Sequence, residues 1–334
     1  MKPLKSNNNL KDDNLLEINH LAVSFALETG RVRAIDDVGF SVPKGKTLGL
    51  VGESGCGKSV TALSVMRLLP KPSAQIEGGE ILFLGRDIVR LNNDQMQEIR
   101  GNRISMIFQE PMTALNPVHR IGRQLEEVFR LHFPDMNKKQ RQERSMGMLE
   151  SVGIPDPVKR FREYPHQISG GMRQRVMIAM ALACKPELLI ADEPTTALDV
   201  TIQAQILELI ATLQEDTGMS VMFITHDMGV IAEICDDVVV MYAGRVAEHA
   251  DTTSLFTNPA HPYTRGLLSS IPRLESRAKS RLNVISGMVP GLEEFTEGCR
   301  FQNRCPEVMI ICKIEQPGMT RVGNGHVAAC HLLK

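Results

Sequence analysis

Apolar and polar positions alternate with two different periods along the first three-quarters of the chain. Short apolar runs predict buried strands, and stretches with an apolar residue every three or four positions predict helices. The strands expected in the central part are Thr47–Val51, Arg103–Gln109, Leu188–Ala191, Val221–Ile224 and Val238–Met241. Because helices fill the gaps between the later strands, we expect an α/β fold with a mostly parallel sheet and ligand sites at the carboxyl ends of its strands.

The strand pattern also covers the N-terminal part. Alternating apolar residues extend over 15–42 around a polar turn at 28–31, and a further strand pair is expected within 76–89. Residues 1–14 are rich in Lys, Asn and Asp and have no apolar middle. We therefore expect them to form a disordered tail and not a signal peptide.

Residues from about 110 to 170 change character. Strand signals stop there, and charged amphipathic patterns predict helices over Ile121–Phe133 and Lys138–Val152. This region is interpreted as a helical subdomain inserted into an α/β domain that spans 15–250. In 251–334 the periodicity decays and prolines interrupt it, so a small irregular C-terminal accessory domain is predicted.

Composition limits the classes of function. The 334 residues carry a net charge of −1 with no block of like charges, which argues against nucleic acid as a partner. The longest apolar stretch, Val176–Cys184, is far shorter than the roughly 20 residues that cross a bilayer. Seven cysteines without an export signal predict thiols or metal ligands and not disulfides, so we expect a cytosolic protein that reaches a membrane only through a partner.

The segment from Gly52 to Ser59 matches the phosphate-binding pattern G-x-x-x-x-G-K-[ST]. An apolar strand precedes it, and a helix is predicted after it over Ser59–Leu69. Lys58 is placed to reach the β- and γ-phosphates, and the Ser59 hydroxyl is placed to ligate Mg²⁺. The residues expected to contact the nucleotide here are Gly52, Ser54, Gly55, Cys56, Gly57, Lys58, Ser59 and Val60.

Cys56 lies inside this phosphate loop. A thiol near the N-terminal end of a helix can have a lowered pKa, which would make it sensitive to oxidation. The favoured interpretation is simpler: Cys56 is a small residue that fits the loop.

Other polar residues follow predicted strands. Asp192 and Glu193 end an apolar strand, where Asp192 is expected to hold Mg²⁺ and Glu193 to polarise the attacking water. Gln109 and His226 end or follow two further strands and are expected to contact the γ-phosphate or that water. Gln109 is also a candidate Mg²⁺ ligand. Taken singly, such a histidine is more often structural, and the two acids could simply solvate a loop.

A second anion-binding helix start is predicted at Ser169, where Gly170 and Gly171 follow an N-capping serine. One γ-phosphate does not need two such helix starts from a single subunit. We therefore expect two subunits to meet, each completing the other's site. Asp199 lies in a tight turn that is expected to position the partner's loop.

The order of these motifs resembles that of the ATP-binding-cassette (ABC) ATPase subunits. The resemblance covers about residues 15–248 and includes Walker A (52–59), the glutamine loop (Gln109), the signature (169–174), Walker B (188–193), the D-loop (197–199) and the switch histidine (His226). It implies a P-loop fold, ATP and Mg²⁺ as cofactors, and a head-to-tail dimer that encloses two ATP molecules. It further implies that Glu193 is the general base, that His226 senses the γ-phosphate, and that Gln109 links the site to a membrane subunit.

Two positions qualify this resemblance. Phe25 resembles the aromatic residue that stacks on adenine, but an ordinary core phenylalanine is the alternative. The signature has Ile168 and Met172 where the family usually has Leu and Gln. Since Ser169 and both glycines are retained, a competent phosphate contact is still expected.

Three further segments resemble the importer ATPases of the oligopeptide, dipeptide and nickel group: Gln109–Pro117, Tyr164–His166 and His261–Thr264. That group implies a peripheral subunit at the cytoplasmic face of the cell membrane. Its expected partners are a second ABC ATPase subunit that differs from this one, two transmembrane permease subunits and an extracytoplasmic solute-binding protein. Di- or oligopeptides are the favoured cargo; nickel or another small solute, or a soluble non-transport ABC ATPase, are the alternatives.

Four cysteines gather near the C-terminus with the spacing C-x5-C-x6-C-x17-C: Cys299, Cys305, Cys312 and Cys330. Four thiolates in a segment of weak apolar periodicity suggest a metal staple in place of a core. Four sulfur ligands suit zinc or an iron–sulfur cluster, and zinc sites usually have tighter cysteine pairs. The resemblance to the peptide-importer group implies a [4Fe-4S] cluster, with zinc or free thiols as the alternatives.

Overall fold

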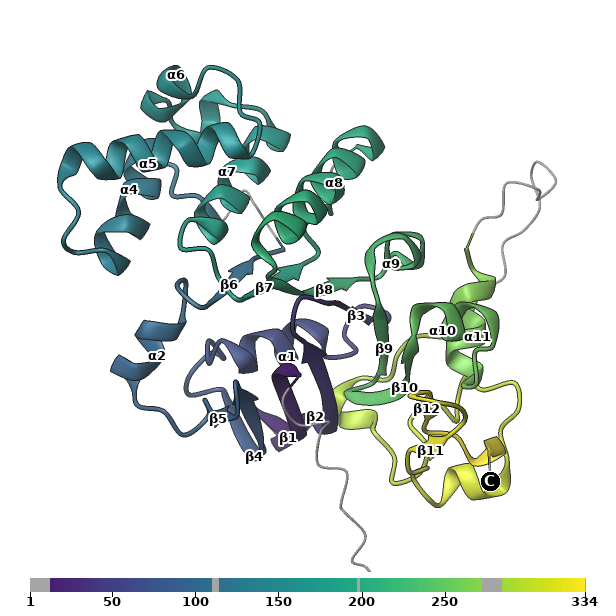
Figure 1. Ribbon diagram of the computed structural model, residues 1–334. Coiled ribbons are helices and arrows are strands. Elements are labelled where there is room, and N and C mark those ends of the chain that lie inside the picture. The colour runs from purple at the N-terminus through teal and green to yellow at the C-terminus, as the bar shows by residue number, and fades with distance from the viewer. Residues whose placement is uncertain (1–12, 110–113, 197–198, 272–283, 334) are drawn as a thin grey trace, which may run out of the picture.

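The computed structural model describes residues 13–109, 114–196, 199–271 and 284–333, which are organised by two β-sheets (Figure 1). The smaller sheet is antiparallel, with the strand order β2-β1-β4-β5. Its strands are β1 (Asn14–Leu27), β2 (Gly30–Pro43), β4 (Ala74–Phe83) and β5 (Arg86–Asp87). The strand pattern predicted for residues 15–42 is therefore a hairpin.

The larger sheet has eight strands in the order β11-β12-β10-β9-β3-β8-β7-β6. Its parallel part consists of β3 (Thr47–Val51), β6 (Ile104–Ile107), β7 (Leu188–Asp192), β8 (Ser220–Thr225) and β9 (Asp237–Tyr242). The predicted parallel α/β sheet is confirmed. Antiparallel strands extend one side of it: β10 (Arg245–Asp251), β11 (Thr320–Arg321) and β12 (Val327–Ala328).

The parallel strands are buried on both faces, which explains their continuous apolar runs. On β7, Leu188 and Ile190 belong to one buried cluster, and Leu189 and Ala191 belong to the other, because successive side chains point to opposite faces. The first cluster also contains residues of the antiparallel sheet, such as Leu16, and the second contains residues of the helical region. The large sheet thus separates two cores.

Helices connect the strands. They are α1 (Lys58–Val65), α2 (Asn93–Ile99), α4 (Ile121–His132), α5 (Lys138–Ser151), α6 (Pro157–Arg162), α7 (Gly170–Leu182), α8 (Val200–Thr217), α9 (Met228–Ile234), α10 (Thr252–Thr257) and α11 (Pro262–Ser269). Short 3₁₀ turns occur at η1 (Pro165–Gln167), η2 (Leu292–Glu294), η3 (Ile310–Lys313) and η4 (His331–Leu333).

The predicted helices α4 and α5 are found within a residue of their expected bounds, and α4 to α7 lie together on one side of Figure 1. A capping box explains where α5 starts, because the Asn137 side chain accepts a hydrogen bond from the backbone amide of Gln140 and the Gln140 side chain accepts one from the backbone amide of Asn137. The prediction that α1 continues to Leu69 was wrong. The helix ends at Val65, and Arg67 adopts a φ of 51°, which an α-helix cannot include.

The C-terminal part contains more helices and strands than its weak apolar periodicity predicts. β10, α10 and α11 follow β9, and β12 pairs with β10 so that this part continues the large sheet. A buried hydrogen bond supports the junction, since Nε2 of His326 lies 2.7 Å from a carboxylate oxygen of Glu248, a fully buried residue of β10.

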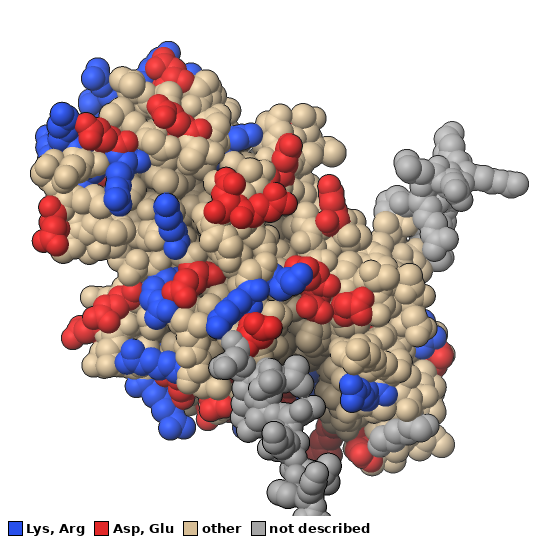
Figure 2. Space-filling view, in the orientation of Figure 1, with Lys and Arg blue, Asp and Glu red and all other residues tan. Residues whose placement is uncertain are grey.

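Among the described residues, no helix combines the length and the apolar character needed to cross a bilayer. Figure 2 shows Lys and Arg side chains interspersed with Asp and Glu side chains over the face in view. The predictions for residues 1–12, and for residues 110–113 and 197–198 of the expected motifs, concern positions outside the described residues.

Candidate nucleotide-binding site

The phosphate loop connects β3 to α1, at the carboxyl end of the central parallel strand. Gly52, Gly55 and Gly57 have φ values of 150°, 81° and 105°, which side-chain-bearing residues rarely adopt. A Cβ at Gly52 would also collide with the carbonyl oxygen of Met241 on β9. The glycines of the motif are therefore required by the backbone path, which leads into the N-terminal end of a helix, a place where anions bind.

Lys58 is buried within the loop and is held by the loop itself. Its Nζ donates to the carbonyl oxygens of Gly52 at 2.7 Å and Glu53 at 3.1 Å. These bonds keep the ammonium group at the place where phosphate oxygens would arrive. Nζ also lies 3.7 Å from Sγ of Cys56.

The environment of Cys56 contradicts the idea of an activated thiol. The side chain is fully buried, and this burial raises the pKa of Cys56, although Lys58 acts in the opposite direction. The favoured alternative, a small residue that fits the loop, agrees with this burial. Ser54 and Val60 lie at or next to the same loop, Ser54 exposed and Val60 half-buried at the start of α1.

Asp192 ends β7 and is buried, 4% exposed. Burial raises its pKa, the Ser59 side chain lowers it by hydrogen bonding, and Glu193 raises it. Within the described part of the chain, Oδ1 of Asp192 has no hydrogen-bond partner. An orphaned carboxylate oxygen next to the Ser59 hydroxyl is the oxygen donor set that Mg²⁺ takes, so these two residues fit the predicted magnesium site.

Glu193 is the meeting point of the predicted catalytic residues. Its Oε2 accepts hydrogen bonds from Nε2 of Gln109 at 2.9 Å and from the hydroxyl of Thr196 at 2.8 Å. Its Oε1 lies 3.2 Å from Nδ1 of His226. Burial acts to raise the pKa of Glu193, but the hydrogen bonds from Thr196 and His226 and the charge of Lys58 lower it overall. The carboxylate is therefore kept ionised.

Glu193 also has an unusual backbone, with a φ of 47°. Its amide donates to the carbonyl oxygen of Ile224 at 2.9 Å, which fixes the residue to the neighbouring strand β8. A non-glycine residue in this left-handed region marks a functional position when the surroundings hold it there. Sequence reasoning missed Thr196, although its spacing of three residues from Glu193 could have indicated it.

The signature residues form a separate helix start. Ser169 caps α7, accepting from the backbone amide of Met172, and Gly170 and Gly171 open the helix. Gly171 faces the side chain of Ile202 on α8. Asp199 caps α8 by accepting from the amide of Ile202, so α7 and α8 start close to each other.

Phe25 lies on β1, opposite Val32 of β2 and Ala74 of β4. It is half-buried and packs against the core cluster of the antiparallel sheet. Its position fits both an adenine-stacking ring and a core side chain.

The four C-terminal cysteines come from one region of the fold. Cys312 and Cys330 are buried, Cys299 and Cys305 are half-buried, and the amide of Cys299 donates to the carbonyl of Cys312 at 2.8 Å. Burial raises the pKa of Cys299 to about 11, and the three neighbouring thiols add to this rise. Four mutually close thiols have the right chemistry for a metal cluster. As placed, however, no three His, Cys, Asp or Glu side chains among the described residues form a ready metal-binding group.

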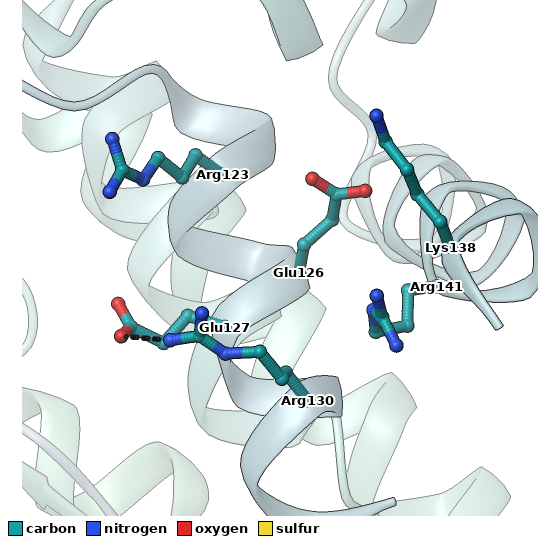
Figure 3. A pocket seen from close by; sticks show the side chains of 6 residues that line it. All are labelled: Arg123, Glu126, Glu127, Arg130, Lys138 and Arg141. Atoms are coloured by element: carbon teal, nitrogen blue, oxygen red, sulfur yellow. Dashed lines mark hydrogen bonds and ion pairs between the residues drawn. The ribbon is translucent and has the colours of Figure 1, made fainter. Parts of the chain in front are cut away.

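Two of the cavities in the described part of the chain border the helical subdomain. An apolar groove of about 430 Å³ lies between the sheet and the helical subdomain, and its lining includes Leu68, Phe108, Leu115, Leu131 and Met180. A charged cavity of about 140 Å³ lies between α4 and α5, with Glu126 pointing toward Lys138 and Arg141 (Figure 3). The lining of the apolar groove includes Phe108, the residue before Gln109. None of the residues that line the charged cavity is a predicted site residue.

Comparisons with known proteins agree with this geometry. The family model described as ABC transporter matches residues 35–196, and the model described as oligopeptide/dipeptide transporter, C-terminal region, matches residues 247–312. The chain is 53% identical over 327 residues to a probable peptide ABC transporter ATP-binding protein of Sinorhizobium fredii, covering 98% of this chain and 97% of that protein. It is 51% identical over 320 residues to the dipeptide transport ATP-binding protein DppD of Bacillus subtilis, covering 96% and 95%.

A solved structure is also similar. The dimeric post-hydrolysis state of the ATP-binding cassette MJ0796, bound to ADP and Pi, matches with a TM-score of 0.64 and 25% sequence identity, covering 71% of this chain and 98% of that one.

Proposed function

The chain belongs to the ABC transporter family of ATP-binding proteins, and on this premise we propose that it is the ATP-hydrolysing subunit of a peptide importer. The observation that carries the proposal is the convergence of Gln109, Thr196 and His226 on the carboxylate of Glu193, beside the unpartnered oxygen of Asp192. Such a carboxylate is suited to accept the proton of the attacking water.

Each residue of the site has a separate role in ATP hydrolysis. The loop amides and Lys58 hold and orient the phosphates, and their positive charge stabilises the charge that develops on the γ-phosphate. Ser59 and Asp192 would hold Mg²⁺, which supplies electrostatic stabilisation at the β- and γ-phosphates when bound. Glu193 takes the proton of the water, and His226 and Gln109 orient that carboxylate.

We propose that a second ATPase subunit supplies the signature of each site. The support is the separate helix start at Ser169, which presents backbone amides and a helix dipole to an anion. The dimeric state of the similar cassette is consistent with this arrangement. We propose that the partner is a different chain, as the importer group implies.

The apolar groove next to Gln109 supports a permease as the membrane partner. Phe108 and Leu68 are each 41% exposed in this groove, and Leu131 is 67% exposed. Large apolar side chains gathered in a groove indicate a protein-binding surface, and a helix of a permease would bury them. This contact would place the subunit on the cytoplasmic face of the membrane, with a solute-binding protein on the other side.

Peptides are the proposed cargo, since the relatives named above are peptide and dipeptide transporters. The complex reconstituted in vesicles, with peptide-loaded binding protein, tests this: ATP hydrolysis and peptide accumulation should rise together. A complex that hydrolyses ATP but responds to nickel and not to any peptide would refute the peptide assignment while leaving the ATPase intact.

We also propose that Cys299, Cys305, Cys312 and Cys330 hold an iron–sulfur cluster as a structural staple. Its support is the gathering of the four thiols, all buried or half-buried, in one region of the fold, and no step of ATP hydrolysis depends on it. Iron and sulfide analysis of anaerobically purified protein should give about four of each per chain. Stoichiometric zinc without iron would overturn this assignment.

A further inference from the structure

The phosphate loop contacts the C-terminal part of the chain at Glu53. Arg304 forms a bidentate ion pair with Glu53, with Nη1 2.6 Å from Oε2 and Nη2 2.9 Å from Oε1. The Arg304 side chain is only 3% exposed, and Glu53 is 31% exposed. Bidentate arginine–carboxylate pairs fix orientation as well as distance, and burial protects this one from screening.

The backbone of Glu53 is held from the same direction. Its amide donates to the hydroxyl of Tyr263 at 2.9 Å, and Tyr263 is fully buried on α11. Both the main chain and the side chain of the second loop residue are thus fixed by residues that lie outside the motif.

A second arginine supports the loop indirectly. Arg300 donates to the carbonyl of Ala243 and, at 2.8 Å, to a carboxylate oxygen of Asp36. The next residue, Gly244, donates its amide to the carbonyl of Cys56 within the phosphate loop at 2.9 Å. Arg300 therefore holds the turn at 243–244, and this turn holds the later half of the phosphate loop.

The segment that carries both arginines is itself firmly packed. Phe301 is 3% exposed and lies against the rings of Tyr242 and Tyr263, with centroid distances of 5.1 Å and 5.4 Å. Arg304 is further fixed by the carbonyls of Ser286 and Ile285, at 3.0 Å and 3.2 Å. The 299–305 segment is therefore a rigid support and not a flexible tail.

We propose that the 299–305 segment positions the phosphate loop for ATP binding, with Arg304 as the principal positioning residue acting through Glu53. The proposal rests on the proposed role of the 52–59 loop in binding the phosphates. Arg304 does not touch the nucleotide in this account. It holds Glu53 so that the loop amides and Lys58 are arranged before ATP arrives, which lowers the cost of ordering them.

Binding of fluorescent mant-ATP with Mg²⁺ to the full-length chain tests this. Arg304→Gln should raise the dissociation constant about tenfold, which corresponds to about 1.4 kcal/mol. The dissociation constant of Arg304→Lys should lie between those of the unmodified chain and Arg304→Gln, because lysine keeps the positive charge but cannot form a bidentate pair with the Glu53 carboxylate. In the assembled transporter, Arg304→Gln should raise KM for ATP and leave kcat at saturating ATP within about twofold.

A double-mutant cycle separates positioning from general destabilisation. Glu53→Gln alone should weaken binding similarly, and adding it to Arg304→Gln should cause little further loss, because both remove the same contact. Arg265→Gln is the matched control. It breaks the ion pair of Arg265 with Glu307, which joins α11 to the same C-terminal part but does not touch the phosphate loop, and should leave ATP affinity unchanged.

The outcomes are distinguishable. A folded Arg304→Gln variant with the affinity of the unmodified chain overturns the proposal, and so does an equal loss in Arg265→Gln or full additivity in the cycle. If Arg304→Gln does not fold, the comparison between Glu53→Gln and Arg265→Gln decides in its place. Tight ATP binding by Lys58→Ala would instead refute the assignment of the phosphate loop itself.

Discussion

Replacing Glu193 by glutamine changes the proposed base while keeping the shape of the site. Gln109 and Thr196 both donate to Oε2, and His226 faces Oε1. The carbonyl oxygen of the new amide can take the place of Oε2 and accept both donors. Its NH₂ group then faces Nδ1 of His226, which accepts when the imidazole proton is on Nε2. The network therefore survives, and the fold should not be disturbed.

The loss of the base sets the size of the effect. General base catalysis typically contributes about 10²–10⁴ in rate, so turnover should fall by that factor, which corresponds to roughly 3–5 kcal/mol of transition-state stabilisation. ATP affinity should remain, because Lys58 and the loop amides are untouched. Since the bound ATP is hydrolysed much more slowly, a closed ATP-bound dimer should accumulate.

The assay is phosphate release by the assembled transporter, combined with filter retention of radiolabelled ATP and a sizing measurement of the dimer. Glu187→Gln is a matched control, because Glu187 precedes the same strand and pairs with the exposed Arg103 on the protein surface. Unchanged turnover in Glu193→Gln, with the control also unchanged, would remove Glu193 as the base. Loss of ATP binding in Glu193→Gln would show that the residue supports the loop and not the chemistry.

Three further predictions concern binding, assembly and stability. Lys58→Ala should raise the dissociation constant for ATP by a factor of about 10²–10⁴, because it removes about two charge-assisted hydrogen bonds of about 1.5–3 kcal/mol each. Isothermal titration calorimetry measures this constant. The isolated chain should be a weak ATPase whose specific activity changes with concentration; full activity independent of dilution would contradict a site shared between subunits. Asp36→Asn should lower the free energy of unfolding by about 2–3 kcal/mol in urea, because Arg245 and Arg300 lose their shared carboxylate. Burial acts to raise the pKa of Asp36, but these arginines lower it overall from its usual 3.8. The stabilising contribution of Asp36 is therefore present above that value and is lost as the pH falls through the lower folded pKa. Equal stability of the unmodified chain and Asp36→Asn at neutral pH would refute this.

The sequence predicts the central part of this fold well because its signals are local. Strands such as Val221–Ile224 are unbroken apolar runs, and a strand buried on both faces requires that pattern. The phosphate loop and the carboxylates after β7 were also predictable, since their spacing is set by a single turn. The meeting of Gln109, Glu193 and His226 follows from parallel strands whose carboxyl ends share one edge of the sheet.

The support of the phosphate loop by the C-terminal part was not predictable in the same way. Arg304 and Glu53 are 251 residues apart, and Tyr263 and Glu53 are 210 apart, so no local pattern connects them. β12 has only two residues, and its pairing with β10 gives no periodic signal. These contacts form where the C-terminal part packs against the sheet, and local sequence patterns do not indicate where that packing occurs.

The geometry around Glu193 also bears on how hydrolysis is controlled. Oε2 of Glu193 accepts from Gln109 and Thr196, and Oε1 lies beside Nδ1 of His226, so these three residues orient the carboxylate while Oε1 keeps a lone pair for the proton of the water. A γ-phosphate would compete for the same donors, because it is the stronger acceptor. Gln109 directly follows Phe108, whose side chain lines the apolar groove. A permease helix that fills this groove therefore acts on a residue adjoining one of the donors that hold the base. The proposed function therefore predicts that the ATP site and the permease act on the same hydrogen bond, between Gln109 and Glu193.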